Sequence, residues 1–168
     1  SLAAPSASAQ QFDTTMAWPL CGRITEAPPA SWVETDGCPV ERWGNAGFTD
    51  EPISSPYGPR PLSSENGRHD FHRGIDLATD SMTPVYAIAD GVVRIAGSHP
   101  GYSDPLVQLR HFRPGEVACG SVGCYHSNYL HLTQAVVVVD ATVSKGDLIG
   151  YSGASASGFE HLHFEIRD

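Results

Sequence analysis

The chain has 168 residues, 40% of them hydrophobic, and a net charge of −9 at pH 7. The length suits one β domain with an appended segment. The acidic balance argues against a nucleic-acid partner, because phosphate binding needs clustered Lys and Arg. Apolar runs fall short of the roughly 20 residues that a membrane span requires, so we expect no membrane-spanning segment. Seventeen Gly and thirteen Pro, with few helical periodicities, predict a turn-rich β protein with little helix.

Residues 1–50 form an N-terminal extension that differs in composition from residues 51–168. The extension is rich in Ala, Ser, Pro and Thr, and it holds all three tryptophans of the chain. Large aromatic rings need a surface on which to pack, so we expect the extension to lie across the body of the protein, held by a Cys21–Cys38 bridge. A prosegment that covers the active site is a functional version of the same arrangement. Ala7-Ser8-Ala9 fits a secretory cleavage pattern, with a disordered linker as the alternative.

Short strands and turns follow from residue 53 onward. Pro84–Ala89 and Val92–Ala96 flank Asp90-Gly91, which is a strong β-hairpin signal. The longest apolar run, Ala135–Val139, predicts a buried strand. Further strands are expected at Leu106–Phe112, Tyr125–Leu132, Leu148–Gly150 and His161–Ile166, with a turn at Lys145-Gly146-Asp147. This pattern predicts an antiparallel β-sheet protein.

Four cysteines permit three pairings. Cys119 and Cys124 flank a flexible loop that a disulfide could close, as Cys21 and Cys38 could close a longer one. The competing interpretation is a structural zinc site, although the C-x-x-C spacing of such sites is missing; its ligands would be Cys119, Cys124, His111 and His126. Paired cysteines favour an oxidising compartment, so we expect a periplasmic or secreted protein.

Histidines and an aspartate recur in three separate places. His161 and His163 are one residue apart in a strand-like run, so their side chains point to the same face. His72 and Asp76 are four positions apart, and His131 lies between two leucines. Such residues are ligands of catalytic zinc, which keeps three protein ligands and one open position for water. Taken singly, each also admits a structural interpretation, as a surface pair or as ordinary strand residues.

Five motifs follow one another along the chain. They are His72-Arg73-Gly74-Ile75-Asp76-Leu77-Ala78, Val85-Tyr86-Ala87 with Asp90-Gly91-Val92-Val93, Tyr129-Leu130-His131-Leu132, Lys145-Gly146-Asp147-Leu148-Ile149-Gly150 and His161-Leu162-His163-Phe164-Glu165. In this order they resemble the lysostaphin-type (LytM-domain) zinc metalloendopeptidases, which cut peptidoglycan peptides. Tyr57-Gly58-Pro59-Arg60 is similar to that family's opening F-G-x-R segment. The resemblance covers residues 54–168 and leaves residues 1–50 outside.

The resemblance implies a mainly β fold, an antiparallel sandwich of the lysostaphin type (a duplicated hybrid motif) with a loop-walled groove. It implies one Zn²⁺ ion bound by His72, Asp76 and His163. His131 and His161 would then be the catalytic histidines, which orient or deprotonate the water and stabilise the oxyanion. The implied activity is hydrolysis of peptide cross-links in bacterial peptidoglycan by a metal-activated water. We expect the protein to act as a monomer.

Four further residues are predicted to border the substrate groove: Tyr57, Arg60, His126 and Glu160. Tyr57 and Arg60 could equally serve packing. Glu160 stands where the family usually has Pro, in the loop before the H-x-H pair. That departure affects the expected substrate preference rather than catalysis, and a solvated loop residue is the alternative. The disulfide loop could bring His126 toward the substrate.

Two rival functions are compatible with the same resemblance. A secreted protease of glycine-rich proteins would keep the site and change the substrate. A catalytically inactive LytM-like activator of a cell-wall amidase would lack one or more ligands, whereas all five positions are filled here.

Overall fold

The computed structural model describes residues 19–20, 53–62, 68–113, 116, 118–120 and 123–168. The predicted Cys21–Cys38 bridge and most of the N-terminal extension lie outside these residues. Pro19 and Leu20 are described: the Pro19 carbonyl accepts a hydrogen bond from Tyr86 N at 2.9 Å, and Leu20 is buried beside Val85. At these two residues, the chain ahead of the main body contacts the core.

The described residues form twelve strands and no helix, as the sequence predicts. They are β1 (Ile53–Ser55), β2 (Gly58–Leu62), β3 (Arg68–His72), β4 (Ile75–Ala78), β5 (Pro84–Tyr86), β6 (Gly91–Gly97), β7 (Leu106–His111), β8 (Tyr125–Leu130), β9 (Leu132–Ala135), β10 (Thr142–Val143), β11 (Leu148–Ala154) and β12 (Glu160–Arg167). Accordingly, no described helix could carry the chain across a membrane.

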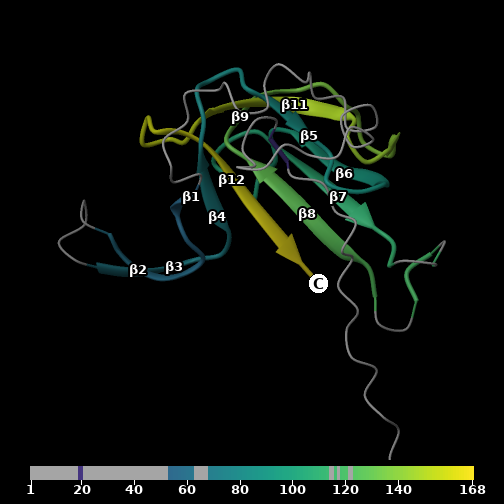
Figure 1. The fold of residues 1–168 in the computed structure, drawn as a ribbon, viewed down its shortest axis with the longest axis horizontal. Helices are drawn as coiled ribbons and strands as arrows, with labels where there is room; N and C mark the ends of the chain where they lie inside the picture. Colours follow the sequence, from purple (N-terminus) through teal and green to yellow (C-terminus); the bar gives the residue numbers. More distant parts are fainter. Residues whose placement is uncertain (1–18, 21–52, 63–67, 114–115, 117, 121–122) are drawn as a thin grey trace, which may run out of the picture.

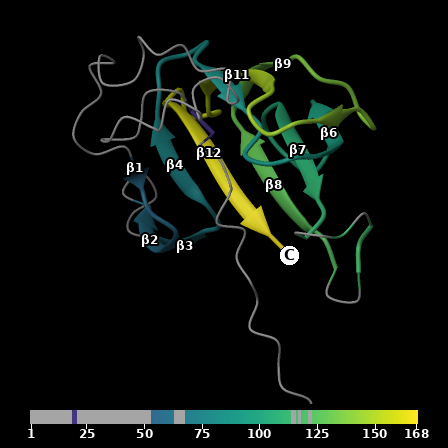
Figure 2. The ribbon, with the colours of Figure 1, turned by 45° about the vertical axis from the view of Figure 1, so that its right-hand side comes forward.

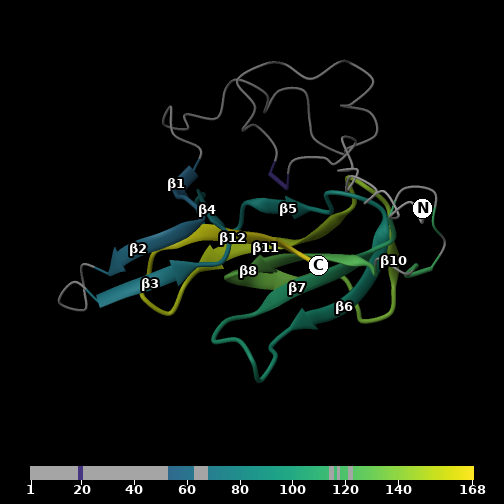
Figure 3. The same cartoon turned by 90° about the horizontal axis from the view of Figure 1, so that it is seen from below.

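Antiparallel pairing connects ten of these strands into one continuous sheet. Its larger part runs in the order β1-β4-β12-β8-β7-β6-β10, and β12 lies between β4 and β8 (Figures 1 and 2). Strand β11 pairs with β5 and β9 and joins them to β12 at Gly153 and Ala154. The β2–β3 hairpin is separate and projects at the end of the molecule away from β6 and β10 (Figure 3).

The core lies between the larger part of the sheet and the β5-β9-β11 part. Val85, Leu132 and Ile149 from the smaller part belong to the same buried cluster as Leu162 and Phe164 of β12. Because side chains of a strand alternate between faces, burial of Leu162 and Phe164 directs His161 and His163 to the opposite face of β12. The amphipathic pattern of the last strand thus positions both histidines.

The predicted hairpin over Pro84–Ala96 is wrong. β5 pairs with β11, whereas β6 pairs with β7 and β10. The chain around Asp90 is used for long-range contacts instead: the Asp90 carboxylate accepts a hydrogen bond from Lys145 N at 2.7 Å, and Ala87 N donates to Asp147 O at 2.9 Å. These contacts lead the chain from one part of the sheet to the other.

The buried strand predicted over Ala135–Val139 is also wrong. β9 ends at Ala135, and beyond it Val138 and Val139 are 70% and 52% exposed. Val137 alone of the valines in this run packs against the core, because the segment is a surface connection toward β10. The strands predicted at Leu106–Phe112 and His161–Ile166 and the turn at Lys145–Asp147 are confirmed.

Candidate metal centre

Strand register brings the metal-binding residues together. On β4 and β12, Asp76 lies directly opposite His163, and residues opposite each other in antiparallel strands share a face. His72 is the last residue of β3, and the turn through Gly74 returns the chain into β4 beside it. The four-residue spacing of His72 and Asp76 therefore reflects a tight turn rather than a helix.

Three donor atoms converge on one point in the buried interior of this site. His72 Nε2 lies 3.0 Å from Asp76 Oδ1 and 2.9 Å from His163 Nδ1, and His163 Nδ1 lies 2.8 Å from Asp76 Oδ1. In a tetrahedral site with bonds of about 2.0–2.1 Å, ligand atoms are about 3.3 Å apart. A small outward shift of these atoms accommodates an ion, so His72, Asp76 and His163 form a metal-binding triad.

Each histidine of the triad uses its second ring nitrogen for a partner outside the triad. His72 Nδ1 donates to the Pro56 carbonyl at 2.8 Å, and His163 Nε2 donates to the Glu165 carboxylate at 3.1 Å. These bonds hold the protons on the far side of each ring and leave the converging nitrogens as acceptors for a metal. Glu165 in turn is fixed by Asn128 Nδ2 at 2.8 Å and by Arg167.

Asp76 divides its two carboxylate oxygens between the triad and Arg60. Oδ1 faces the histidines, while Oδ2 accepts a hydrogen bond from Arg60 Nη1 at 3.2 Å. Burial opposes ionisation of Asp76, but the hydrogen bond from His163 and the charges of His161 and His72 outweigh it and lower the pKa to about 2. The carboxylate is therefore ionised at neutral pH, as a metal ligand must be.

Without a metal, His163 holds a proton strongly. Burial lowers its pKa, but hydrogen bonds to Asp76 and Glu165 outweigh burial and raise the pKa to about 9. The pKa of Glu165 is lowered to about 2, because hydrogen bonds from His163, Arg167 and Asn128 outweigh its burial. A metal ion at the triad competes with this proton on His163.

His131 reaches the site through an irregular backbone. Strand β8 ends at Leu130, and His131 has φ = 61°, in the left-handed region that residues other than glycine rarely occupy. The strand predicted over Tyr125–Leu132 is thus interrupted at the histidine itself. Leu130 lies opposite His163, so the turn places the His131 ring 4.6 Å from the ring of His161 and 5.9 Å from that of His163, between ring centroids.

The two predicted catalytic histidines differ in their partners. His131 Nδ1 donates to Asp104 Oδ2 at 2.8 Å, whereas His161 Nδ1 donates to the Phe159 carbonyl at 3.0 Å. His161 Nε2 points toward the triad and lies 3.5 Å from Asp76 Oδ1. Burial and the neighbouring His161 lower the pKa of His131, against the effect of Asp104.

A pocket opens over Asp76, His163 and these two histidines. Its lining comes from β1, β2, β4 and β12, from His131, and from the loops before β7 and between β11 and β12; the residues are Ser54, Arg60, Asp76, Ala78, Ser103, Asp104, His131, Ser155, Ala156, Ser157, Phe159, Glu160, His161 and His163. The loop residues are mostly polar, and two members of the triad, Asp76 and His163, line the pocket together with His131 and His161.

The four predicted groove residues fall into two groups. Arg60 and Glu160 line this pocket, whereas Tyr57 and His126 are not among its lining residues. Tyr57 stacks edge-to-face on Phe71, with ring centroids 5.2 Å apart. His126 lies on β8, opposite Arg110 of β7 and Arg167 of β12.

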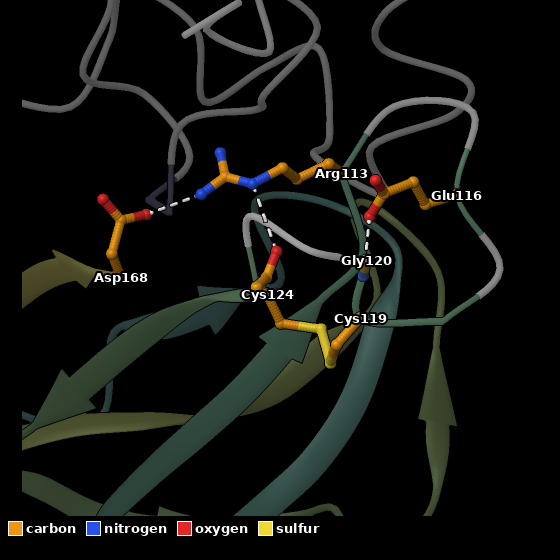
Figure 4. The surroundings of a disulfide bond; sticks show 7 residues. Arg113, Glu116, Cys119, Gly120, Cys124 and Asp168 are labelled. Carbon is orange, nitrogen blue, oxygen red and sulfur yellow. Dashed lines mark hydrogen bonds and ion pairs between the residues drawn. A yellow bond between two sulfur atoms is a disulfide. The ribbon is translucent and has the colours of Figure 1, made fainter.

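The disulfide predicted between Cys119 and Cys124 is present, so the alternative of a structural zinc site there is wrong. His111, another ligand of that alternative, is buried and bonds Ser127 Oγ at 2.7 Å instead. Arg113 donates from Nε to the Gly123 carbonyl, within the disulfide loop, and from Nη2 to Asp168 (Figure 4).

Sequence reasoning missed two polar residues of the site. Glu165 carries a recognisable signal, since it lies two residues after His163 in a strand and therefore on the same face. Asp104 carries none: it is 27 residues from His131 and meets that residue only in the fold.

Comparison with known proteins agrees with this geometry. Residues 70–168 match the model of Peptidase family M23. The chain is 37% identical over 116 residues to the peptidoglycan DD-endopeptidase ShyA of Vibrio cholerae, a match that covers 68% of this chain and 24% of ShyA. It thus spans about a quarter of that relative.

Two solved structures are similar in fold. A zinc-containing peptidase from Vibrio cholerae has a TM-score of 0.53 and 30% identity, over 68% of this chain and 32% of the other. Lysostaphin from Staphylococcus simulans, an antimicrobial peptidase, has a TM-score of 0.55 and 30% identity, over 70% of this chain and 43% of the other. With the family match covering more than half of its residues, the chain belongs to peptidase family M23.

Proposed function

We propose that this chain is a zinc-dependent endopeptidase that hydrolyses peptide cross-links of bacterial peptidoglycan. The observation that carries the proposal is the convergence of His72, Asp76 and His163, whose donor atoms lie within 3.0 Å of one another. The zinc-containing structural neighbour and the activity named for ShyA support the choice of metal and substrate.

The triad would hold one zinc ion through His72 Nε2, Asp76 Oδ1 and His163 Nδ1. Bound there, zinc would lower the pKa of a water to about 7 and polarise the scissile carbonyl. Two nitrogens and one carboxylate oxygen form the donor set of many zinc hydrolase sites. The hydrogen bonds to Pro56 and Glu165 would keep both imidazoles oriented toward the ion.

His131 and His161 would handle the proton. Each ring donates through Nδ1 to an acceptor outside the reaction centre, so Nε2 of each ring is the nitrogen left to accept a proton. Either ring can accept a proton as water oxygen bonds to the carbonyl carbon, and then return it to the amine as the C–N bond breaks. The lowered pKa of His131 favours the neutral ring, which is the form that can act as the base.

The location of the protein follows from the same proposal. A wall hydrolase must act outside the cytoplasm, and the Cys119–Cys124 disulfide needs an oxidising compartment. We therefore propose a periplasmic or secreted protein.

Cleavage of purified muropeptides tests the proposal. Cross-linked dimers from several wall chemotypes are incubated with the protein, and the products are identified by mass spectrometry. We expect release of shorter peptides, abolition by a chelator, and restoration by zinc. Loss of cleavage in His131→Ala would show that the histidine beside the triad is needed, and unchanged cleavage would exclude that role.

The two rival functions give different outcomes in the same assay. Cleavage of glycine-rich proteins without cleavage of any muropeptide would indicate a protease of another substrate class. No cleavage of either, combined with stimulation of an amidase, would indicate an inactive activator.

A further inference from the structure

Asp104 is a pocket residue whose carboxylate is directed at His131. It lies in the connection between β6 and β7, and its Oδ2 accepts hydrogen bonds from His131 Nδ1 at 2.8 Å and from Ser103 Oγ at 2.9 Å. The side chains of Asp104 and His131 are each only 16% exposed. This partly buried, hydrogen-bonded pair borders the metal-binding triad without contributing to it.

The backbone holds the two partners in place from both sides. Leu132 N donates to the Pro105 carbonyl at 3.0 Å, which ties together the residues that follow His131 and Asp104. On the next pair along, Leu106 lies opposite Leu130 in the β7–β8 register. The strained backbone of His131, with φ = 61°, is therefore anchored by pairing on either side of it.

We infer that Asp104 is a positioning residue that fixes the tautomer and orientation of His131 for catalysis. The catalytic part of this inference rests on the proposed function. The Asp104 carboxylate accepts the hydrogen bond from His131 Nδ1, so the proton of a neutral His131 ring resides on Nδ1. The lone pair is then on Nε2, in a ring that lines the pocket and lies beside the rings of His161 and His163.

Removal of this acceptor frees both the tautomer and the rotation of the ring. A ring protonated at Nε2 offers no lone pair to a water in the pocket, and that fraction of molecules cannot accept the proton. His161 has a backbone carbonyl as its acceptor, which no side-chain substitution removes. Of these two histidines, His131 is therefore the one whose orientation a substitution at Asp104 changes.

Three variants of the zinc-loaded full chain test the role of Asp104. Asp104→Ala removes the acceptor, and we expect kcat to fall about 10- to 100-fold with unchanged KM and one zinc per chain. Asp104→Asn keeps the shape of the side chain, but its amide can donate as well as accept a hydrogen bond, so we expect part of the His131 rings to carry the proton on Nε2 and kcat to fall. Asp168→Ala is the matched control, because this aspartate is exposed and paired with Arg113 outside the pocket.

A spectroscopic readout separates positioning from a purely structural role. Long-range ¹H–¹⁵N correlation spectra report which imidazole nitrogen carries the proton, and the His131 signals are those that disappear in His131→Gln. We expect a protonated Nδ1 in the wild type, and a mixture of tautomers in both Asp104→Ala and Asp104→Asn. This measurement does not depend on cleavage, so it decides the tautomer even where no muropeptide is cut.

A wild-type His131 protonated at Nε2 would overturn the inference, as would an unchanged tautomer and kcat in Asp104→Ala. A fall of kcat in Asp104→Asn with its His131 tautomer unchanged would also contradict a role through positioning. Should Asp104→Ala fail to fold, the tautomer and kcat of Asp104→Asn still decide between the outcomes.

Discussion

The two ends of strand β8 illustrate different ways of holding a chain together. At Leu130 the strand leads into the strained His131 and the metal-binding triad, where buried polar groups face one another. At Tyr125 it follows the loop closed by Cys119–Cys124 and bonded by Arg113. The first end needs an ion for its converging donors, whereas the second is closed by a covalent bond. Substitutions at the Leu130 end should therefore affect activity more than folding. Substitutions at the Tyr125 end should affect folding more than activity.

The largest effect is expected from His163→Ala, which removes a ligand from the site end. We expect loss of stoichiometric zinc and a fall in muropeptide cleavage of about 10³-fold or more, because the ionised water supplied by the metal is lost. Zinc content measured by mass spectrometry and cleavage measured on the same sample check this prediction. Retention of one zinc per chain with full cleavage would remove His163 from the ligand set.

Zinc affinity should depend on pH through His163. Its pKa of about 9 in the metal-free protein means that zinc must displace a proton at neutral pH. Zinc affinity should therefore rise about tenfold per pH unit well below pH 9, and about 50-fold between pH 7 and 9. Calorimetric titration in buffers of different ionisation enthalpy counts the protons released. Binding at pH 7 without proton release would contradict this account.

The same pKa values predict the stability of the metal-free chain. The raised pKa of His163 stabilises the fold fully below about pH 6.5, and this contribution is lost as pH rises through about 9. The lowered pKa values of Asp76 and Glu165 stabilise the fold above about pH 4.5, and this contribution is lost as pH falls through about 2. Denaturant unfolding of the stripped protein should therefore give its highest stability between these limits, near pH 5–6.

A smaller effect is expected from Gly74→Ala, in the turn between two ligands. A Cβ atom there would lie 2.3 Å from the Phe164 carbonyl oxygen and 2.9 Å from His163 Nε2, so β12 would have to move. We expect about a tenfold loss of zinc affinity and a decrease of about 1–3 kcal/mol in the free energy of unfolding.

Gly101→Ala is the control for that variant, because the nearest atom to its Cβ is in the His99 side chain at 3.4 Å. Both substitutions add one methyl group to a glycine. Equal zinc affinities in the two variants would show that the close approach at Gly74 has no bearing on the site.

The smallest effect on function should come from the disulfide end. Replacement of Cys119 and Cys124 by alanine should lower the free energy of unfolding by about 2 kcal/mol, since the bridge closes a short loop. Zinc content and kcat should stay at wild-type values. A loss of zinc in this variant would show that the two ends of β8 are coupled, contrary to the comparison above.

How much of the fold the sequence predicts depends on how local the relevant contacts are. The H-x-H pair was predictable, because alternation along one strand decides the face of His161 and His163. The prediction of a hairpin at Asp90-Gly91 was wrong, because contacts of Asp90 and Ala87 with residues near Lys145 override a local turn preference. The prediction of a buried strand over Ala135–Val139 was wrong because hydrophobicity alone does not show which strand edge is available for pairing.

Whether a site residue could be predicted also depends on how local its contacts are. The triad was predictable from motifs whose residues are neighbours in sequence or in one strand. The partners that orient its rings were not all predictable, since the Pro56 carbonyl and Asp104 reach their histidines only through the tertiary fold. The N-terminal extension with its Cys21–Cys38 bridge and the monomeric state remain predictions.

Zinc titration of the stripped full chain, followed by cleavage of cross-linked muropeptides, tests whether a single zinc ion at the triad is needed for hydrolysis. We expect no cleavage without zinc and a rate that rises linearly to a plateau at one equivalent, because one ion occupies the site formed by His72, Asp76 and His163. Full cleavage by the stripped protein, or a rate that needs a second equivalent, would contradict it.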